Sequence, residues 1–299
     1  MKEKIYALGF FDGVHLGHQA LLEACRRMAA EKGCQTAAIT FEKHPKALFL
    51  PTPPALINSI EDRKALLRSC GMEAIRVLPV TRESMAQPWQ DFLEGLCADG
   101  AAGFVCGDDF RFGHKGEGNA EKLQAFCEEK NLPCVIVPEQ TMDGIRISST
   151  HIRQLIEHGE METVAKFLGH PHIFSGEVVH GRHLGRTIGV PTINFRVPAN
   201  VLIPSHGVYA AQAVLEDGRR FAAVTNVGVR PTVEDGRGVT VESWLLDFDG
   251  DLYDRAVRVE FFSKLRDEIR FDSLDSLKRQ IALDAEHTRN YFAEQTIHT

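Results

Sequence analysis

The sequence lacks the features of a membrane-spanning or disulfide-stabilised protein. No apolar run approaches the roughly 20 residues that a membrane-spanning helix needs. The segment Met1–Lys4 leads directly into a short predicted strand, which is unlike a signal peptide. All seven cysteines lie between Cys25 and Cys134, and none stand in a Cys-x-x-Cys spacing. An odd, unevenly placed set of this kind indicates reduced thiols in a cytoplasmic protein.

An excess of positive charge is also missing. The 299 residues include 34 Lys and Arg against 41 Asp and Glu, which gives a formal net charge of −7 at pH 7. This balance does not favour an extended nucleic-acid-binding surface, although a local basic site remains possible. The composition, 43% apolar and 25% charged, is that of an ordinary globular protein, and the length favours two domains.

In the first half of the chain, apolar runs alternate with helical patterns. The predicted strands are residues 5–9, 35–41, 74–79, 103–107 and 134–138, and the predicted helices are residues 18–30, 60–69, 89–98 and 120–129. Such alternation is typical of a Rossmann-like α/β domain, in which helices cover both faces of a parallel sheet. Ligands of these sheets bind beyond the carboxyl ends of the strands.

The turn after the first predicted strand, residues 9–18, reads Gly-Phe-Phe-Asp-Gly-Val-His-Leu-Gly-His. Gly13 and Gly17 have no Cβ, so the backbone there can approach a ligand closely. The helix start offers unpaired N–H groups to a phosphate, and His15 and His18 share one face of its first turn. Donors aimed at developing charge suit nucleotidyl transfer. A solvated surface pair and a zinc site are alternatives, but no matching His or Cys pair stands nearby at ligand spacing.

Three further loops are predicted to reach the same sheet edge, and the third of them contains residues 147–153. Residues 41–45, Phe-Glu-Lys-His-Pro, follow the second predicted strand, and residues 107–119 follow the fourth. In the second loop, Phe110 and Phe112 either wall a planar ligand or pack in the core.

Residues 147–153, Ile-Ser-Ser-Thr-His-Ile-Arg, open a helix after the fifth predicted strand. Ser149 or Thr150 suits the N-cap of that helix. Two hydroxyls at a helix start, with Arg153 one turn later, also form a phosphate clamp.

After residue 168 the pattern changes, which predicts domains at 1–168 and 169–299. Six short predicted strands, without helices between them, indicate a small antiparallel β-barrel. They span residues 173–179, 192–195, 207–215, 220–227, 239–248 and 256–262, and a terminal helix is predicted over residues 273–292.

A glycine-rich basic segment, residues 181–194, interrupts this strand pattern. Its backbone N–H groups, with Arg182 and Arg186, suit a polyphosphate. Thr192 and Asn194 alternate along the next strand and point to one side, where a hydroxyl and an amide oxygen suit Mg²⁺.

Glu242 lies on another predicted strand. It is either a general base toward a hydroxyl or an exposed strand carboxylate.

Several motifs, taken together and in order, resemble one enzyme family. Gly-x-Phe-Asp-Gly-Val-His-x-Gly-His, Asp-Phe-Arg-Phe-Gly and Ile-Ser-Ser-Thr-x-Ile-Arg resemble the adenylyltransferase module of bacterial bifunctional riboflavin kinase/FAD synthetases. Gly-Arg-x-Leu-Gly-Arg-Thr-Ile-Gly-x-Pro-Thr-x-Asn, Asn-Val-Gly-x-Arg-Pro-Thr-Val and Val-Glu-Ser resemble the riboflavin kinase module. The resemblance covers nearly the whole chain. His170 and His172 stand where Arg and Tyr are usual.

The resemblance implies two reactions, phosphorylation of riboflavin to FMN and adenylylation of FMN to FAD, with ATP as co-substrate and Mg²⁺ bound by Thr192 and Asn194. The implied catalytic residues are His15, His18, Ser149, Thr150, Arg153 and Glu242. Implied substrate or nucleotide contacts are Gly9, Phe11, Asp12, Gly13, Gly17, His44, Asp109, Phe110, Arg111, Asn119, Gly181, Arg182, Gly185, Arg186, Thr187, Gly189, Arg266 and Glu268.

The expected partners are riboflavin, FMN and ATP, with no nucleic acid and no membrane. A chain with only one of the two activities and a flavin carrier without turnover are the alternatives. The oligomeric state stays open.

Overall fold

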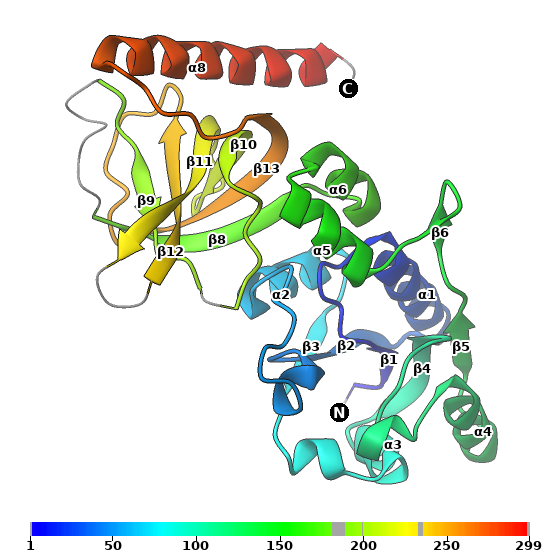
Figure 1. Cartoon of the computed structure of the whole chain (residues 1–299). Coiled ribbons are helices and arrows are strands. Elements are labelled where there is room, and N and C mark those ends of the chain that lie inside the picture. Colours follow the sequence, from blue (N-terminus) through cyan, green and yellow to red (C-terminus); the bar gives the residue numbers. More distant parts are fainter. Residues whose placement is uncertain (1, 181–188, 199, 233–235, 298–299) are drawn as a thin grey trace. The chain divides into compact units, whose positions relative to one another are not determined.

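The computed structural model describes residues 2–180, 189–198, 200–232 and 236–297 (Figure 1). Packing divides the chain into two compact units, Met1–His151 and Ile152–Thr299. Helix α6 (Met161–Leu168) packs on strands of the second unit, so this division comes before the predicted boundary at residues 168 and 169. The boundary between the functional domains stays a prediction.

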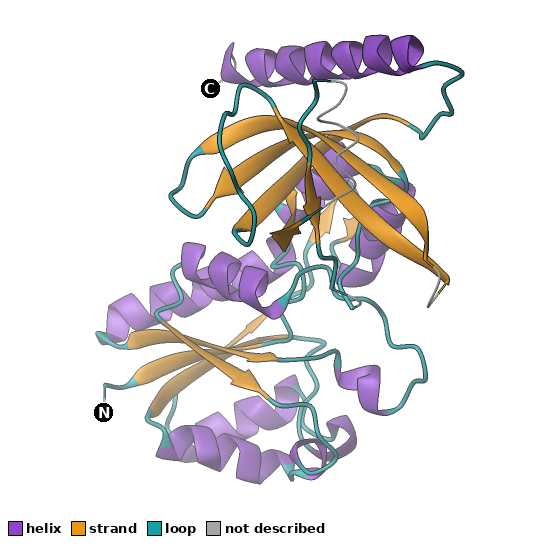
Figure 2. Cartoon of the chain, turned by 90° about the vertical axis from the view of Figure 1, so that its left-hand side faces the viewer, coloured by secondary structure: helices purple, strands orange, loops and turns teal. Residues whose placement is uncertain are grey.

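The first unit is a five-stranded parallel sheet with helices on both faces, which confirms the predicted α/β class (Figure 2). Its spatial order is β3-β2-β1-β4-β5. The strands are β1 (Lys4–Leu8), β2 (Gln35–Phe41), β3 (Ala74–Leu78), β4 (Ala101–Gly107) and β5 (Cys134–Val137). The helices that cover the sheet are α1 (Leu16–Lys32), α2 (Ile60–Ser69), α3 (Trp89–Ala98) and α4 (Ala120–Lys130).

Alternate residues of the central strand β1 account for the two helical layers. Ile5 and Ala7 pack in one apolar cluster with residues of α1 and α2, whereas Tyr6 and Leu8 pack in a second cluster with residues of α3 and α4. Successive side chains of a strand point to opposite faces, so a strand with apolar residues on both faces needs cover on both sides. Because the strands are parallel, the loops that follow them leave from one edge of the sheet.

Short elements lie in these loops. The 3₁₀ helices are η1 (Pro45–Leu48), η2 (Ser84–Ala86) and η3 (His114–Gly116). The strands β6 (Thr141–Met142) and β7 (Ile145–Arg146) form an antiparallel hairpin, which was not predicted. Two-residue strands are too short to leave a periodic pattern in the sequence.

The second unit begins within helix α5 (Ser149–His158), and its strands form a closed antiparallel barrel, as predicted. The order around the barrel is β10-β11-β12-β9-β8-β13. The strands are β8 (His172–Val179), β9 (Ile193–Phe195), β10 (Gly207–Leu215), β11 (Arg220–Thr232), β12 (Gly236–Leu245) and β13 (Ala256–Arg266). The terminal helix α8 (Leu274–Ile297) packs on β10 and β11 (Figure 1).

Candidate active sites

The turn between β1 and α1 has an unusual backbone. Phe11, Gly13 and Val14 have φ angles of 56°, 85° and 42°, in the left-handed region that a β-branched residue such as Val14 rarely adopts. Phe11 and Val14 are nonetheless fully buried. A Cβ at Gly9 would lie 2.9 Å from the Phe11 ring, so that ring packs directly over Gly9. Such strain is typical of functional turns.

The two histidines of this turn lie against each other. Their rings are stacked, with centroids 3.6 Å apart and planes inclined by 14°. His15 is the N-cap of α1, and its Nδ1 accepts a hydrogen bond from the backbone N–H of His18 at 3.2 Å. A neutral His15 that accepts at Nδ1 carries its proton on Nε2, so Nε2 is the atom that can donate to a ligand.

His18 is held in its neutral form. Its ring meets the Phe11 ring edge-on at 5.2 Å. Burial, the neighbouring His15 and the guanidinium of Arg63 lower the pKa of His18 well below its usual value. Near neutral pH this histidine is therefore a hydrogen-bond donor and acceptor rather than a fixed cation.

The start of α5 is tied to the same turn. Ser149 Oγ donates a hydrogen bond to the carbonyl of Asp12 at 2.9 Å. Ser148, rather than Ser149 or Thr150, accepts the hydrogen bond from the His151 N–H and so caps the helix. Thr150 is exposed. Because Ser148 caps the helix, the hydroxyls of Ser149 and Thr150 do not serve as its N-cap. Arg153 follows one turn later on the same helix.

The loop after β2 also reaches the turn. The ring of Phe10 meets that of His44 edge-on at 5.2 Å. His44 caps η1 by accepting a hydrogen bond from the Lys46 N–H at 3.1 Å. In the loop after β4, the strand on the other side of β1, the exposed Asp109 forms an ion pair of 2.5 Å with Arg146 of β7.

Some predicted contact residues have structural roles of their own. Asn119 is the N-cap of α4, since its Oδ1 accepts from the Lys122 N–H at 2.9 Å. Phe110 is stacked on the buried Phe112 with ring centroids 5.6 Å apart, at the border of the apolar cluster beside α3 and α4. Arg111 is exposed. Contacts of these residues with substrate stay predictions.

In the second unit, three polar residues lie side by side across neighbouring strands. Glu242 of β12 is paired with Asn194 of β9 on one side and with Asn226 of β11 on the other. Directly paired residues of antiparallel strands point to the same face. Thr192 precedes β9 by one residue and is half-buried. Asn226 was missed in the sequence analysis, although it opens the Asn-Val-Gly motif that carried the resemblance.

Arg266, the last residue of β13, and Glu268, which follows that strand, contact different elements. A Cβ at Gly228 would lie 2.5 Å from Glu268 Oε1 and 3.2 Å from the Asn226 amide nitrogen, so the Glu268 carboxylate lies against β11 near Asn226. The guanidinium of Arg266 binds the buried Asp284 of α8, at 3.0 Å from Nε and 2.8 Å from the terminal nitrogen. Arg266 thus fastens α8 to the barrel.

Part of the predicted phosphate loop lies outside the described residues, namely Gly181, Arg182, Gly185, Arg186 and Thr187. Gly189 is described, with a φ of 79° and open space around the position of a Cβ.

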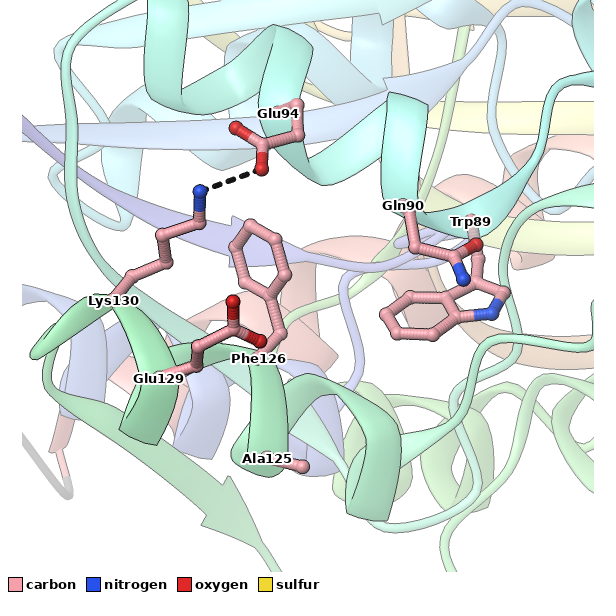
Figure 3. Close-up of a pocket in the computed structure, with 7 residues that line it drawn as sticks. All are labelled: Trp89, Gln90, Glu94, Ala125, Phe126, Glu129 and Lys130. Carbon is pink, nitrogen blue, oxygen red and sulfur yellow. Dashed lines mark ion pairs between the residues drawn. The ribbon is translucent and has the colours of Figure 1, made fainter.

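A pocket of about 310 Å³ lies between α3 and α4, apart from the residues above (Figure 3). In Figure 3 the ring of Phe126 lies between the side chains of Trp89 and Lys130. The Nζ atom of Lys130 forms an ion pair with the Glu94 carboxylate at 2.7 Å. The predicted site residues are not among those that line this pocket.

Both parts of the chain match known families. A family model described as FAD synthetase matches residues 1–151, and one described as riboflavin kinase matches residues 168–292. The curated bifunctional riboflavin kinase/FMN adenylyltransferase of Listeria monocytogenes is 34% identical over 294 residues, which cover 97% of this chain and 93% of that protein. Its counterpart from Escherichia coli K12 is 36% identical over 291 residues, with coverage of 96% and 92%.

The fold also matches a solved structure over nearly its whole length. A crystal structure described as a macrolide-efflux protein from Streptococcus pneumoniae superposes with a TM-score of 0.87 at 32% identity, covering 97% of this chain and 94% of that one. Across the part of the chain that the structure describes, none of the helices combines the length and apolar character needed to traverse a bilayer.

Proposed function

The chain belongs to the family of bifunctional riboflavin kinase/FMN adenylyltransferases, and from this premise we propose which residues serve each reaction. It phosphorylates riboflavin with ATP to give FMN, and it transfers AMP from a second ATP to FMN to give FAD and pyrophosphate. Residues 1–151 match the FAD synthetase model and contain the His15–His18 turn. Residues 168–292 match the riboflavin kinase model and contain Glu242. This separation of the motifs carries the assignment.

In the kinase reaction, Glu242 accepts the proton of the ribityl 5′-hydroxyl, which then attacks the γ-phosphate of ATP. The support is its place in the strand register between Asn194 and Asn226, whose side chains share one face of the barrel wall with it. Phosphoryl transfer needs positioning and charge stabilisation more than covalent chemistry from the protein.

Mg²⁺ fits the donors of this face. The hydroxyl of Thr192 and the amide oxygen of Asn194 are hard oxygen ligands. Among the described residues, no group of three or more His, Cys, Asp or Glu forms a metal cage. A few protein oxygens suit an ion that is otherwise held by nucleotide phosphates and water. When bound, Mg²⁺ neutralises charge on the phosphates, and we propose Thr192 and Asn194 as its protein ligands.

In the adenylyl transfer, the FMN phosphate attacks the α-phosphate of ATP and pyrophosphate leaves. A phosphate is already largely ionised near pH 7, so no strong general base is required. His15 and His18 donate hydrogen bonds to the phosphates, and Ser149, Thr150 and Arg153 offset the charge of the departing pyrophosphate. The stacked histidines and the Ser149–Asp12 hydrogen bond support this arrangement. Contacts to the nucleotide and flavin by the remaining predicted residues are part of the same proposal.

The experiment is to incubate the purified chain with riboflavin, ATP and MgCl₂ and to separate the flavins over time. FMN followed by FAD is expected. His15→Ala should abolish FAD formation and leave FMN formation intact, whereas Glu242→Gln should stop riboflavin phosphorylation while supplied FMN is still adenylylated. Loss of both activities in a folded Glu242→Gln protein would argue against separate sites.

We also propose a cytoplasmic location. All seven cysteines are free thiols in the structure, which suits a reducing compartment.

A further inference from the structure

Arg63, an arginine that the sequence pattern does not single out, is fully buried beneath the His15–His18 turn. Arg63 belongs to the first turn of α2, where a charged residue is expected to face solvent. Its side chain is instead 0% exposed. A guanidinium is stable at such a position only when protein acceptors and a counter-charge compensate for its lost hydration.

The Arg63 guanidinium joins two segments that are distant in the sequence. One terminal nitrogen donates to the carbonyl of Phe41 at 2.9 Å, to Thr40 Oγ1 at 3.2 Å and to the carbonyl of Phe10 at 3.4 Å. The other terminal nitrogen is 3.4 Å from a carboxylate oxygen of Asp12, which is also 0% exposed. The end of β2 is therefore fastened to the turn that follows β1.

Asp12 extends this connection to two more segments. Its carboxylate accepts the backbone N–H of Ile57 at 3.0 Å, and its carbonyl accepts the hydroxyl of Ser149. The loop that leads to α2 and the start of α5 are thus linked through Asp12 to Arg63.

The guanidinium also supports an aromatic contact. Its carbon lies 4.5 Å from the centroid of the Phe10 ring, and that ring carries His44 edge-on at 5.2 Å. A planar guanidinium can satisfy several acceptors and stack on a ring at once, whereas the ammonium of lysine is a compact point charge.

We infer that Arg63 is a positioning residue for adenylyl transfer, which sets the His15–His18 turn, His44 and the start of α5 relative to one another. It acts through Asp12 and Phe10 and touches no reacting atom. This inference rests on the proposed function of the first unit. Its positive charge also contributes to the neutral state of His18, which is consistent with the same role.

The test is Arg63→Lys, because lysine keeps a positive charge beside Asp12 but cannot span the acceptors of both segments. Displacement of catalytic groups by about 1 Å costs up to about 100-fold in rate. We expect kcat for FAD formation from supplied FMN to fall by about that factor, while the KM values for ATP and FMN change by less than about threefold. The kinase activity of the same protein should be unchanged.

Arg68→Lys is the matched control, since Arg68 lies on the same helix and is exposed. It should leave FAD formation at the wild-type rate. In a Trp244→Phe background, Trp89 of the first unit is the sole tryptophan, and its fluorescence reports the folded fraction of each variant. A purely structural role predicts that lost activity follows the unfolded fraction and returns on cooling.

Wild-type kcat in a folded Arg63→Lys protein would overturn the inference, as would a loss that equals the unfolded fraction or a change confined to KM. If the wild-type chain forms no FAD from FMN, the proposed function itself fails, and this result is distinct from any behaviour of the variant.

Discussion

Acidification is expected to destabilise the barrel unit through one buried histidine. His172 begins β8 with 0% exposure, and its ring is stacked on that of Phe261 at 5.8 Å. Burial, and to a smaller extent the neighbouring His170, lowers the pKa of His172 from 6.5 to about 4. The unfolded chain therefore takes up a proton near pH 6.5, whereas the folded chain does so only near pH 4.

The difference between these two pKa values sets the size of the effect. It corresponds to roughly 3 kcal/mol in the free energy of unfolding, all of which is present above pH 6.5 and is lost as the pH falls to about 4. Roughly 2 kcal/mol is already lost at about pH 5. Since a domain is typically stable by about 5–15 kcal/mol, this loss is a large fraction of the stability of the unit.

The assay follows the only tryptophan of the barrel unit. In a Trp89→Phe background, Trp244 of β12 is the sole tryptophan, and its fluorescence reports urea unfolding at about pH 7.5, 6 and 5. His172→Phe keeps an aromatic ring against Phe261 but cannot titrate, so it should lose roughly 2 kcal/mol less between the outer two pH values. His206→Gln is the control, because His206 is exposed. Equal losses in the parent and His172→Phe would refute the reasoning.

Further predictions concern the barrel. Gly228→Ala should displace the Glu268 carboxylate, which a new Cβ would meet at 2.5 Å, so steady-state kinetics should give a several-fold higher riboflavin KM with unchanged FMN adenylylation. Asp284→Ala leaves the Arg266 guanidinium without its buried partner and should lower the free energy of unfolding in urea by about 3 kcal/mol. Excess EDTA should stop FMN formation until Mg²⁺ is restored, and Asn194→Ala should raise the Mg²⁺ concentration needed for half-maximal rate.

The sequence predicted the regular elements well because their patterns are periodic and clearly punctuated. The bounds of α2 and α3 agree with the predicted ones, and a serine at residue 59 caps α2 by accepting from the Asp62 N–H. The predicted strand over residues 220–227 was too short, since β11 continues to Thr232. Glycine and proline at residues 228 and 231 usually weaken or end strands, but pairing with β12 overrides that preference here.

Site residues could be predicted only where residues that are adjacent in the sequence also act together in the structure. The turn glycines and the histidine pair follow one another in sequence, so their proximity required no knowledge of the fold. Asn119 illustrates the opposite case, because a polar residue before a helix serves equally as a cap or a ligand, and here it caps α4. The role of Arg63 could not be predicted from the sequence, because its acceptors come from two other segments. Helical periodicity contains no information about such distant partners.

Retention of one of the two activities does not show that the whole chain is folded. Each unit has its own apolar core, so a substitution that unfolds one unit can abolish one reaction and spare the other. Selective loss of FAD formation by His15→Ala or Arg63→Lys is therefore evidence about a site only if the first unit remains folded. Trp89, whose ring meets that of Phe112 edge-on at 6.5 Å in that unit, can supply this evidence in a Trp244→Phe background. Trp244 can do so for Glu242→Gln in a Trp89→Phe background. Since the altered unit and its reporter tryptophan unfold together, native fluorescence combined with a lost reaction is the result that assigns a residue to chemistry.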